Sequence, residues 1–94
     1  MVPKSAAAHN QLDRASTSIS LNIAEGNGKF TAADRCRFFD NARGSALESA
    51  ACLDILVAKS ILPLREALAG KEMLFEIVCM LVGLIRSNSP TRDV

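Results

Sequence analysis

Residues that could carry out chemistry are few in this sequence, and they do not form a motif. It holds one histidine, His9, and three cysteines, Cys36, Cys52 and Cys79. There is no CxxC pair, and no cysteine or carboxylate stands at ligand spacing from His9, so a metal site is not predicted. A Cys–His nucleophile pair would need His9 to meet a thiol across the fold, which nothing local favours. We therefore expect no catalytic residue, no metal and no cofactor, and do not expect an enzyme.

The cellular setting follows from the cysteines and from the most apolar segment. An odd number of cysteines among helix-forming neighbours argues against a disulfide scaffold and favours a reducing compartment. The first residues lack the apolar core of a signal peptide. The most apolar run, from Met73 to Ile85, is shorter than the ~20 residues that span a membrane and contains Glu76. We expect a cytoplasmic protein without a membrane span.

Length and charge limit the fold further. Ninety-four residues, 49% of them hydrophobic, make one globular domain over 1–94 with a thin core, to which self-association would add burial. The net charge of +1 gives no general attraction to nucleic acids or anionic membranes. Any basic surface must therefore be local.

The apolar spacing predicts an all-α protein, an antiparallel up-down bundle with helices at about 4–25, 32–60 and 63–87, and a flexible polar tail at about 88–94. Gly26 should end the first helix with a positive φ. Thr31 should cap the second, with Asp34 in its first turn. Each helix carries an apolar stripe: Ala8, Leu12, Ala15, Ile19 and Ile23 in the first; Phe38, Ala42, Ala46 (or Ser45), Ser49, Leu53 and Leu56 in the second; and Leu64, Leu68, Phe75, Val78, Val82 and Ile85 in the third.

Two features of the later helices suggest contacts beyond a simple hairpin. Gly44 in mid-helix costs ~1 kcal/mol relative to alanine, which suggests a packing reason. Between Met73 and Ile85 only Glu76 and Gly83 are not apolar. A helix apolar on nearly all sides is buried on several sides, so we infer a subunit interface along the third helix.

A group of polar residues lies within the helical faces near the first junction. Two interpretations stand: a structural network that satisfies buried polar groups, or a binding site. In the first, Arg43 would pair with Glu25 or Glu48 because a buried charge needs a partner. The group comprises Asn22, Glu25, Arg43, Ser45 and Glu48.

Four basic residues fall within fifteen positions and form the tentative nucleic-acid-binding set: Lys29, Arg35, Arg37 and Arg43. Asp34 and Asp40 offset them, so a solvated helix face with i,i+3 ion pairs explains them equally well. No aromatic residue other than Phe38 and Phe39, both expected to be buried, is interleaved for base stacking. In a ring of subunits, however, the patch would repeat and its phosphate contacts would add.

Three sequence blocks resemble one known family. Residues 18–28, SISLNIAEGNG, resemble its S-I-P-S-N-I-A-E-G-x-G segment; residues 38–48, FFDNARGSALE, resemble F-x-x-x-A-R-G-S-x-x-E; and residues 80–87, MLVGLIRS, resemble M-L-x-G-L-I-x-S. The family is that of the four-helix-bundle 23S rRNA intervening-sequence proteins, to which bacterial diversity-generating-retroelement accessory proteins are similar. The blocks occur in the family's order and span about 18–87.

The resemblance implies a non-catalytic helical bundle that assembles into a barrel-like homopentamer. In the retroelement branch it further implies contacts with nucleic acid and with a reverse transcriptase. The chain departs from the pattern in three ways. The family begins with another amphipathic helix, which we expect this sequence to lack; Ser20 replaces a proline; and the strongly basic surface of the nucleic-acid-binding branch is not evident.

The functional hypothesis is therefore a non-catalytic oligomeric scaffold of the intervening-sequence type that contacts RNA or DNA through the basic set. One alternative is a protein-interaction module that docks a partner helix between the first and third helices. Another is a truncated remnant without activity. An enzyme would need titratable groups to converge on a pocket around Arg43 and Glu48.

Overall fold

The computed structural model describes residues 4–89, which form three helices. They are α1 (Lys4–Asn27), α2 (Ala32–Ala58) and α3 (Leu64–Asn88). The all-α class and the number of helices are confirmed, and the bounds differ from the predicted ones by at most two residues. Asn88 still belongs to α3, and the rest of the predicted tail, beyond Ser89, lies outside the described residues.

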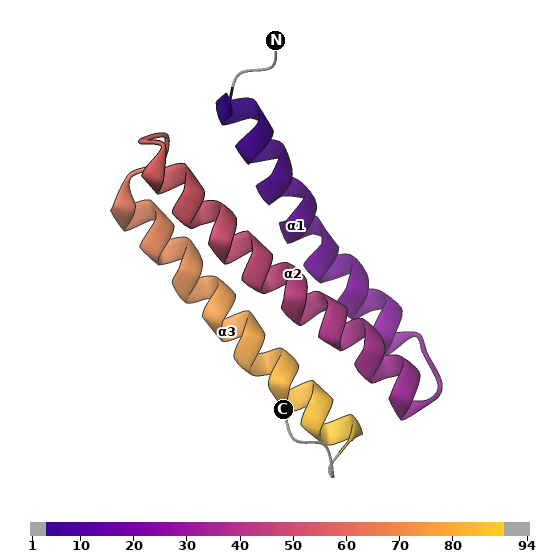
Figure 1. Cartoon of the computed structure of the whole chain (residues 1–94). Helices are drawn as coiled ribbons and strands as arrows, with labels where there is room; N and C mark the ends of the chain where they lie inside the picture. Colours follow the sequence, from indigo (N-terminus) through magenta and orange to yellow (C-terminus); the bar gives the residue numbers. More distant parts are fainter. Residues whose placement is uncertain (1–3, 90–94) are drawn as a thin grey trace.

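Contacts between neighbouring helices have the register of an antiparallel arrangement. Gln11 contacts Glu48 and Ser18 contacts Ser45, so positions rise along α1 as they fall along α2. On the other side, Lys71 contacts Asp54, and the Cys36 thiol donates a weak hydrogen bond to the Ile85 carbonyl at 3.8 Å. Neighbouring helices are therefore antiparallel, and in the view of Figure 1 α1 and α3 run downward while α2 runs upward.

The helices lie side by side, with α2 in the middle (Figure 1). Among residues 4–89, α1 and α3 have no Cα pair within 8 Å, so each outer helix contacts only α2. The principal extents are 44 × 27 × 16 Å, and the Cα radius of gyration is 14.9 Å. A compact chain of this length would have a radius of gyration near ~12.4 Å. The fold is thus one open layer, thinner than a closed bundle.

The core follows the two stripes expected from the sequence. On α1, Ala15 and Ile19 are buried against α2, and on α2 every stripe residue except the half-buried Phe38 is buried. Phe39 has no exposed surface and belongs to the main core cluster. The cluster holds Cys36, Phe39, Ala42, Leu81 and Ile85, with Ile23, Ile77 and Leu84 packed against it.

The α1–α2 connection has the predicted cap but a different role for its first glycine. The Thr31 hydroxyl accepts a hydrogen bond from the Asp34 amide at 3.1 Å, as expected for an N-cap. The positive φ predicted for Gly26 is wrong, because Gly26 is still helical and no described glycine has a positive φ. A Cβ at Gly26 would lie 2.6 Å from Cε1 of Phe39. Close approach of the helices, not backbone handedness, requires glycine here.

The α2–α3 connection carries the one described non-glycine residue with a positive φ, Ser60 at 58°. The Ser60 amide donates to the Val57 carbonyl at 2.9 Å, and the Ile61 amide donates to the Leu56 carbonyl at 2.9 Å. This pair of bonds defines a Schellman motif with Ser60 at the position that glycine usually takes.

Replacing Ser60 with glycine should therefore stabilise the fold by about 0.5–1 kcal/mol, because glycine adopts a left-handed conformation without a Cβ clash. The measurement is thermal unfolding, with the midpoint raised by about 2–8 °C. Ser20→Gly, at an exposed helical position in α1, is the control and should cost about 0.5 kcal/mol. A midpoint that falls in both variants would contradict this account of the turn.

Candidate functional site

Two of the five residues assigned to the junction network meet through a residue that sequence reasoning missed. The Asn22 side-chain amide donates to the carbonyl oxygen of Ser18 at 2.8 Å and to its hydroxyl at 2.9 Å. The Ser45 hydroxyl donates to the same Ser18 hydroxyl at 2.9 Å. Ser18 therefore links α1 to α2. The signal for it was available, because Ser18 lies one helical turn before Asn22.

The other three residues of that set contact different partners. Glu25 pairs with Lys29 at 3.8 Å, and Arg43 pairs with Asp40 at 3.9 Å instead of with either suggested glutamate. Glu48 accepts a hydrogen bond from Gln11 at 3.1 Å. The five residues thus take part in separate helix-surface and interhelical contacts, and they do not converge on one centre.

The four basic residues do not form one patch either. With about 100° of rotation per helical residue, Arg37 points more than ~100° away from Arg35 and Arg43 around α2. Arg35 is partly buried, and its Nε is buried without a hydrogen-bond partner. Arg37 pairs with Asp34 at 3.9 Å on the exposed surface. Only part of the predicted set therefore shares a surface.

That shared surface is the end of the α1–α2 hairpin. The Lys29 ammonium lies 5.1 Å and the Arg37 guanidinium 5.0 Å from the centre of the Phe38 ring. Such distances permit cation–π attraction, which holds both cations beside the half-buried ring. Phe30, next to Lys29 in the chain, is fully exposed. We call Lys29, Phe30, Arg37 and Phe38 the hairpin tip. Phe30 was not among the residues predicted from the sequence, although its position between two helices indicated that it would be exposed.

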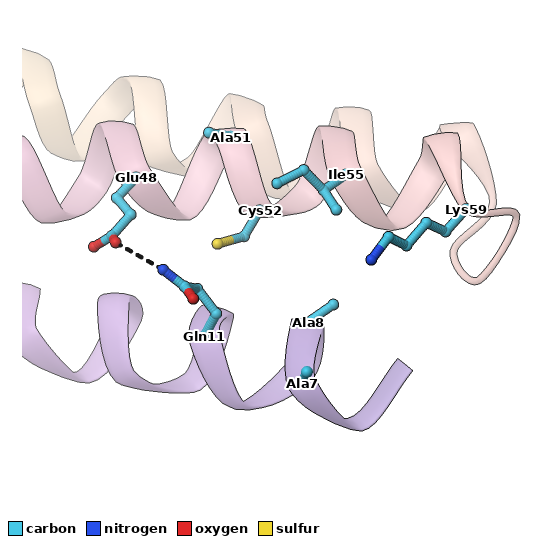
Figure 2. A pocket seen from close by; sticks show the side chains of 8 residues that line it. All are labelled: Ala7, Ala8, Gln11, Glu48, Ala51, Cys52, Ile55 and Lys59. Atoms are coloured by element: carbon cyan, nitrogen blue, oxygen red, sulfur yellow. Dashed lines mark hydrogen bonds between the residues drawn. The ribbon is translucent and has the colours of Figure 1, made fainter. Parts of the chain in front are cut away.

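At the opposite end of the hairpin, a cleft of about 410 Å³ opens between α1 and α2. Figure 2 shows the Gln11–Glu48 hydrogen bond bridging the two helices, with Lys59 at the far side from that bond. The remaining lining residues are small or apolar: Ala7, Ala8, Ala51, Cys52 and Ile55. Arg43 does not line this cleft, so the two residues named for an enzyme site do not meet there.

One buried thiol, that of Cys52, has a perturbed pKa. Burial, and secondarily the nearby Glu48 carboxylate, raise the pKa of the Cys52 thiol, which keeps it protonated and poorly nucleophilic at neutral pH. All three cysteines are free thiols, and only Cys79 is exposed.

Within residues 4–89, no three His, Cys, Asp or Glu side chains gather as a metal site requires. No helix of this part combines the length and apolarity needed to cross a bilayer.

The largest feature that the fold leaves open is the surface of α3. Its buried residues, Ala67, Leu81 and Ile85, form one line toward α2. Two further lines of apolar residues run along α3, one on each side of the buried line. The first α3 flank lies about 90° around the helix from the buried line and comprises Leu64, Leu68, Phe75 and Val82. The second α3 flank lies about 100° away on the other side and comprises Met73, Ile77, Met80 and Leu84.

Both α3 flanks expose large apolar side chains. Phe75 is 69% exposed on the first, and Met73 is 65% exposed on the second. Ile77 and Leu84 of the second flank pack against the core cluster, whereas none of the first flank does. Only one helix, α2, contacts α3 within residues 4–89. The subunit interface inferred along this helix from the sequence stays a prediction. The first flank is the larger unused apolar surface.

These observations define an all-α protein whose three helices form a single layer. The family model for the 23S rRNA-intervening sequence protein matches residues 3–83, and the chain belongs to that family. Searches of curated proteins and of solved structures gave no significant match. The match covers most of all three helices, including the first two resembling blocks and the beginning of the third.

Proposed function

We propose that this protein is a non-catalytic structural subunit that self-associates through α3 and contacts a nucleic acid at the hairpin tip. The observation that carries the proposed self-association is the open layer, which leaves the first α3 flank without a partner among residues 4–89. A pentamer is the assembly that the family resemblance implies. The family name, which refers to 23S rRNA, makes a nucleic acid the first partner to test.

The physical case for self-association rests on the cost of the uncovered surface. Burying a side chain such as leucine or phenylalanine contributes about 1.5–3 kcal/mol each. The first α3 flank presents Leu64, Leu68 and Phe75 more than half exposed along one side of a helix. In a ring such as a pentamer, a different surface of the next copy would cover this flank, because contact between two identical flanks closes as a dimer. Gly83 supports the same view, since a Cβ there would meet nothing within 4 Å in the described chain.

The case for nucleic acid rests on the hairpin tip. Lys29 and Arg37 lie on opposite sides of one connection, yet both are drawn to Phe38. Their carboxylate partners, Glu25 and Asp34, are at 3.8 and 3.9 Å, which marks weak and solvent-exposed pairs. Phosphates could therefore compete for both cations. In an oligomer the tip recurs in every subunit, and modest contacts add.

The Lys29→Gln, Arg37→Gln double variant tests this part of the proposal. Binding of a single-stranded RNA oligonucleotide should weaken with rising salt, because each phosphate contact releases counterions. The slope of log K against log salt is negative for such binding. In the double variant it should become less negative by about 1–2 units, as expected for the loss of two contacts. Titration of fluorescent oligonucleotide by anisotropy at several salt concentrations gives both slopes.

Arg43→Gln serves as the matched control, because Arg43 is only 29% exposed at its side chain and points away from the tip. It should leave the slope nearly unchanged. Equal slopes for the wild type and the double variant would remove the hairpin tip from the binding surface. Absence of binding at low salt would remove nucleic acid from the proposed function.

A second candidate function is the docking of a partner helix on the second α3 flank. Met73 and Met80 are exposed beside Ile77 and Leu84, and methionine adapts to varied partner surfaces. Ile77 and Leu84 of this flank pack against the same core cluster as Ile23 of α1. A Met80→Glu variant that keeps the wild-type mass but loses a captured helical partner would favour this candidate over self-association.

A further inference from the structure

We propose that Phe30 is a base-stacking platform, so that the hairpin tip selects unpaired over paired nucleotides. This inference rests on the proposed function, because it names the kind of nucleic acid that the same tip would bind. Phe30 is the most exposed large apolar side chain described, with none of its surface covered. Burying a phenylalanine side chain normally stabilises a protein by about 1.5–3 kcal/mol. Phe30 contributes no such free energy within the described chain, because it is not buried there.

The backbone around Phe30 is held on both sides. On the α1 side, the Gly28 amide donates to the Ala24 and Glu25 carbonyls at 3.2 Å, and the Lys29 amide donates to Gly26 at 3.2 Å. On the α2 side, Thr31 caps its helix. The connection is therefore a fixed turn that presents an aromatic ring to solvent. Because the backbone of this turn is already fixed, stacking of a base would need to order only the Phe30 side chain.

Two cationic side chains share the hairpin tip with Phe30. Lys29 precedes Phe30 directly, and Arg37 meets Lys29 at the Phe38 ring. Single-stranded nucleic acids are bound by this combination, in which cations follow the backbone and aromatic rings stack on bases. A base in a duplex is stacked on both faces and is not available to Phe30. The ring therefore adds affinity only for unpaired nucleotides, with little dependence on which base is present.

Two variants test the proposal with one RNA oligonucleotide of about 12 nucleotides, used as a single strand and as a blunt duplex. Phe30→Ala should weaken single-strand binding about 5- to 100-fold, the range for loss of one stacking contact, and should leave duplex binding and the salt slope unchanged. Because Phe30 makes no buried contact, the variant should unfold at the same temperature as the wild type.

Phe30→Trp supplies a direct readout, since the sequence contains no tryptophan. The indole should support binding, and its fluorescence should be quenched by the single strand but not by the duplex. Ile55→Trp is the control: Ile55 is 47% exposed and lies roughly 35 Å from the tip along α2. Its fluorescence should not change with either nucleic acid.

The outcomes separate this inference from the proposed function. If the wild type binds RNA with the expected salt dependence but Phe30→Ala binds equally well and Phe30→Trp is not quenched, stacking is overturned and the scaffold function stands. If the wild type binds neither nucleic acid at low salt, both fail. If Phe30→Ala instead lowers the mass of the assembly, Phe30 is a subunit contact and the stacking role is overturned.

Discussion

Replacing Phe75 with glutamate is expected to separate the assembled protein into single chains. Phe75 is 69% exposed at the middle of the first α3 flank, so the substitution removes little contact within the described chain. In an assembly that covers this flank, the carboxylate would be buried without a partner, which costs several kcal/mol. The association constant should fall by roughly 100-fold or more. Sedimentation velocity across a range of protein concentrations gives the distribution of masses directly.

Leu21→Glu is the matched control for this result. Leu21 is 62% exposed on α1, the outer helix that has no contact with α3. The same change in charge at a similar exposure should leave the mass unchanged. If Phe75→Glu and the wild type show the same mass distribution, the first α3 flank is not the interface. If Leu21→Glu dissociates the assembly instead, the interface lies on α1.

A second large effect is expected at Gly26, where substitution with alanine should destabilise the fold by about 1–3 kcal/mol, the usual cost of overpacking. The new Cβ would lie 2.6 and 2.9 Å from two Phe39 ring carbons and 3.2 Å from the Arg35 carbonyl oxygen. Phe39 is completely buried in the core cluster, so its ring cannot turn away without displacing its neighbours. Urea unfolding should show a lower midpoint.

Gly44→Ala is the control for the same chemical change. A Cβ at Gly44 would meet nothing within 4 Å in the described chain, so this variant should gain up to about 1 kcal/mol from better helix propensity. The two substitutions are predicted to change the free energy of unfolding in opposite directions. This difference can be assigned to the contact of the Gly26 position with Phe39. Both variants must be unfolded at one protein concentration, because assembly contributes to stability. Equal midpoints for the two variants would show that the α1–α2 contact is looser than described.

The first two helices could be predicted from the sequence because the buried residues of each helix lie largely on one apolar stripe. The Thr31 cap and the following Asp34 fixed the start of α2. The bounds held because glycine and proline stand only at the connections. Periodicity alone was sufficient where one face of a helix is buried.

The helix α3 was predictable as a helix but not in its orientation. Apolar residues surround it, so the periodicity did not say which line faces α2. The stripe read from the sequence included Leu64, Leu68 and Phe75, which are exposed in the structure. Nor could the sequence tell whether three helices enclose a core or lie in one layer, since both need the same short connections.

The candidate site was predicted only in part, because its members were judged by type and spacing along the chain. The basic residues were grouped by proximity in sequence, whereas rotation around α2 sends Arg35 and Arg43 away from Arg37. Gly44 has no packing reason within the described chain, contrary to expectation. Phe30 was missed because aromatic residues were assumed to be buried, an assumption that fails in a connection of four residues.

The most direct test of the central claim, that the open layer is completed by further copies, is the mass of the wild-type protein by sedimentation equilibrium at low micromolar concentration. A single chain has a mass of 10.1 kDa, and the pentamer implied by the family resemblance would have a mass of about 50 kDa. We predict a discrete mass several times that of one chain, stable on dilution. A constant mass of 10.1 kDa at every concentration would contradict the claim.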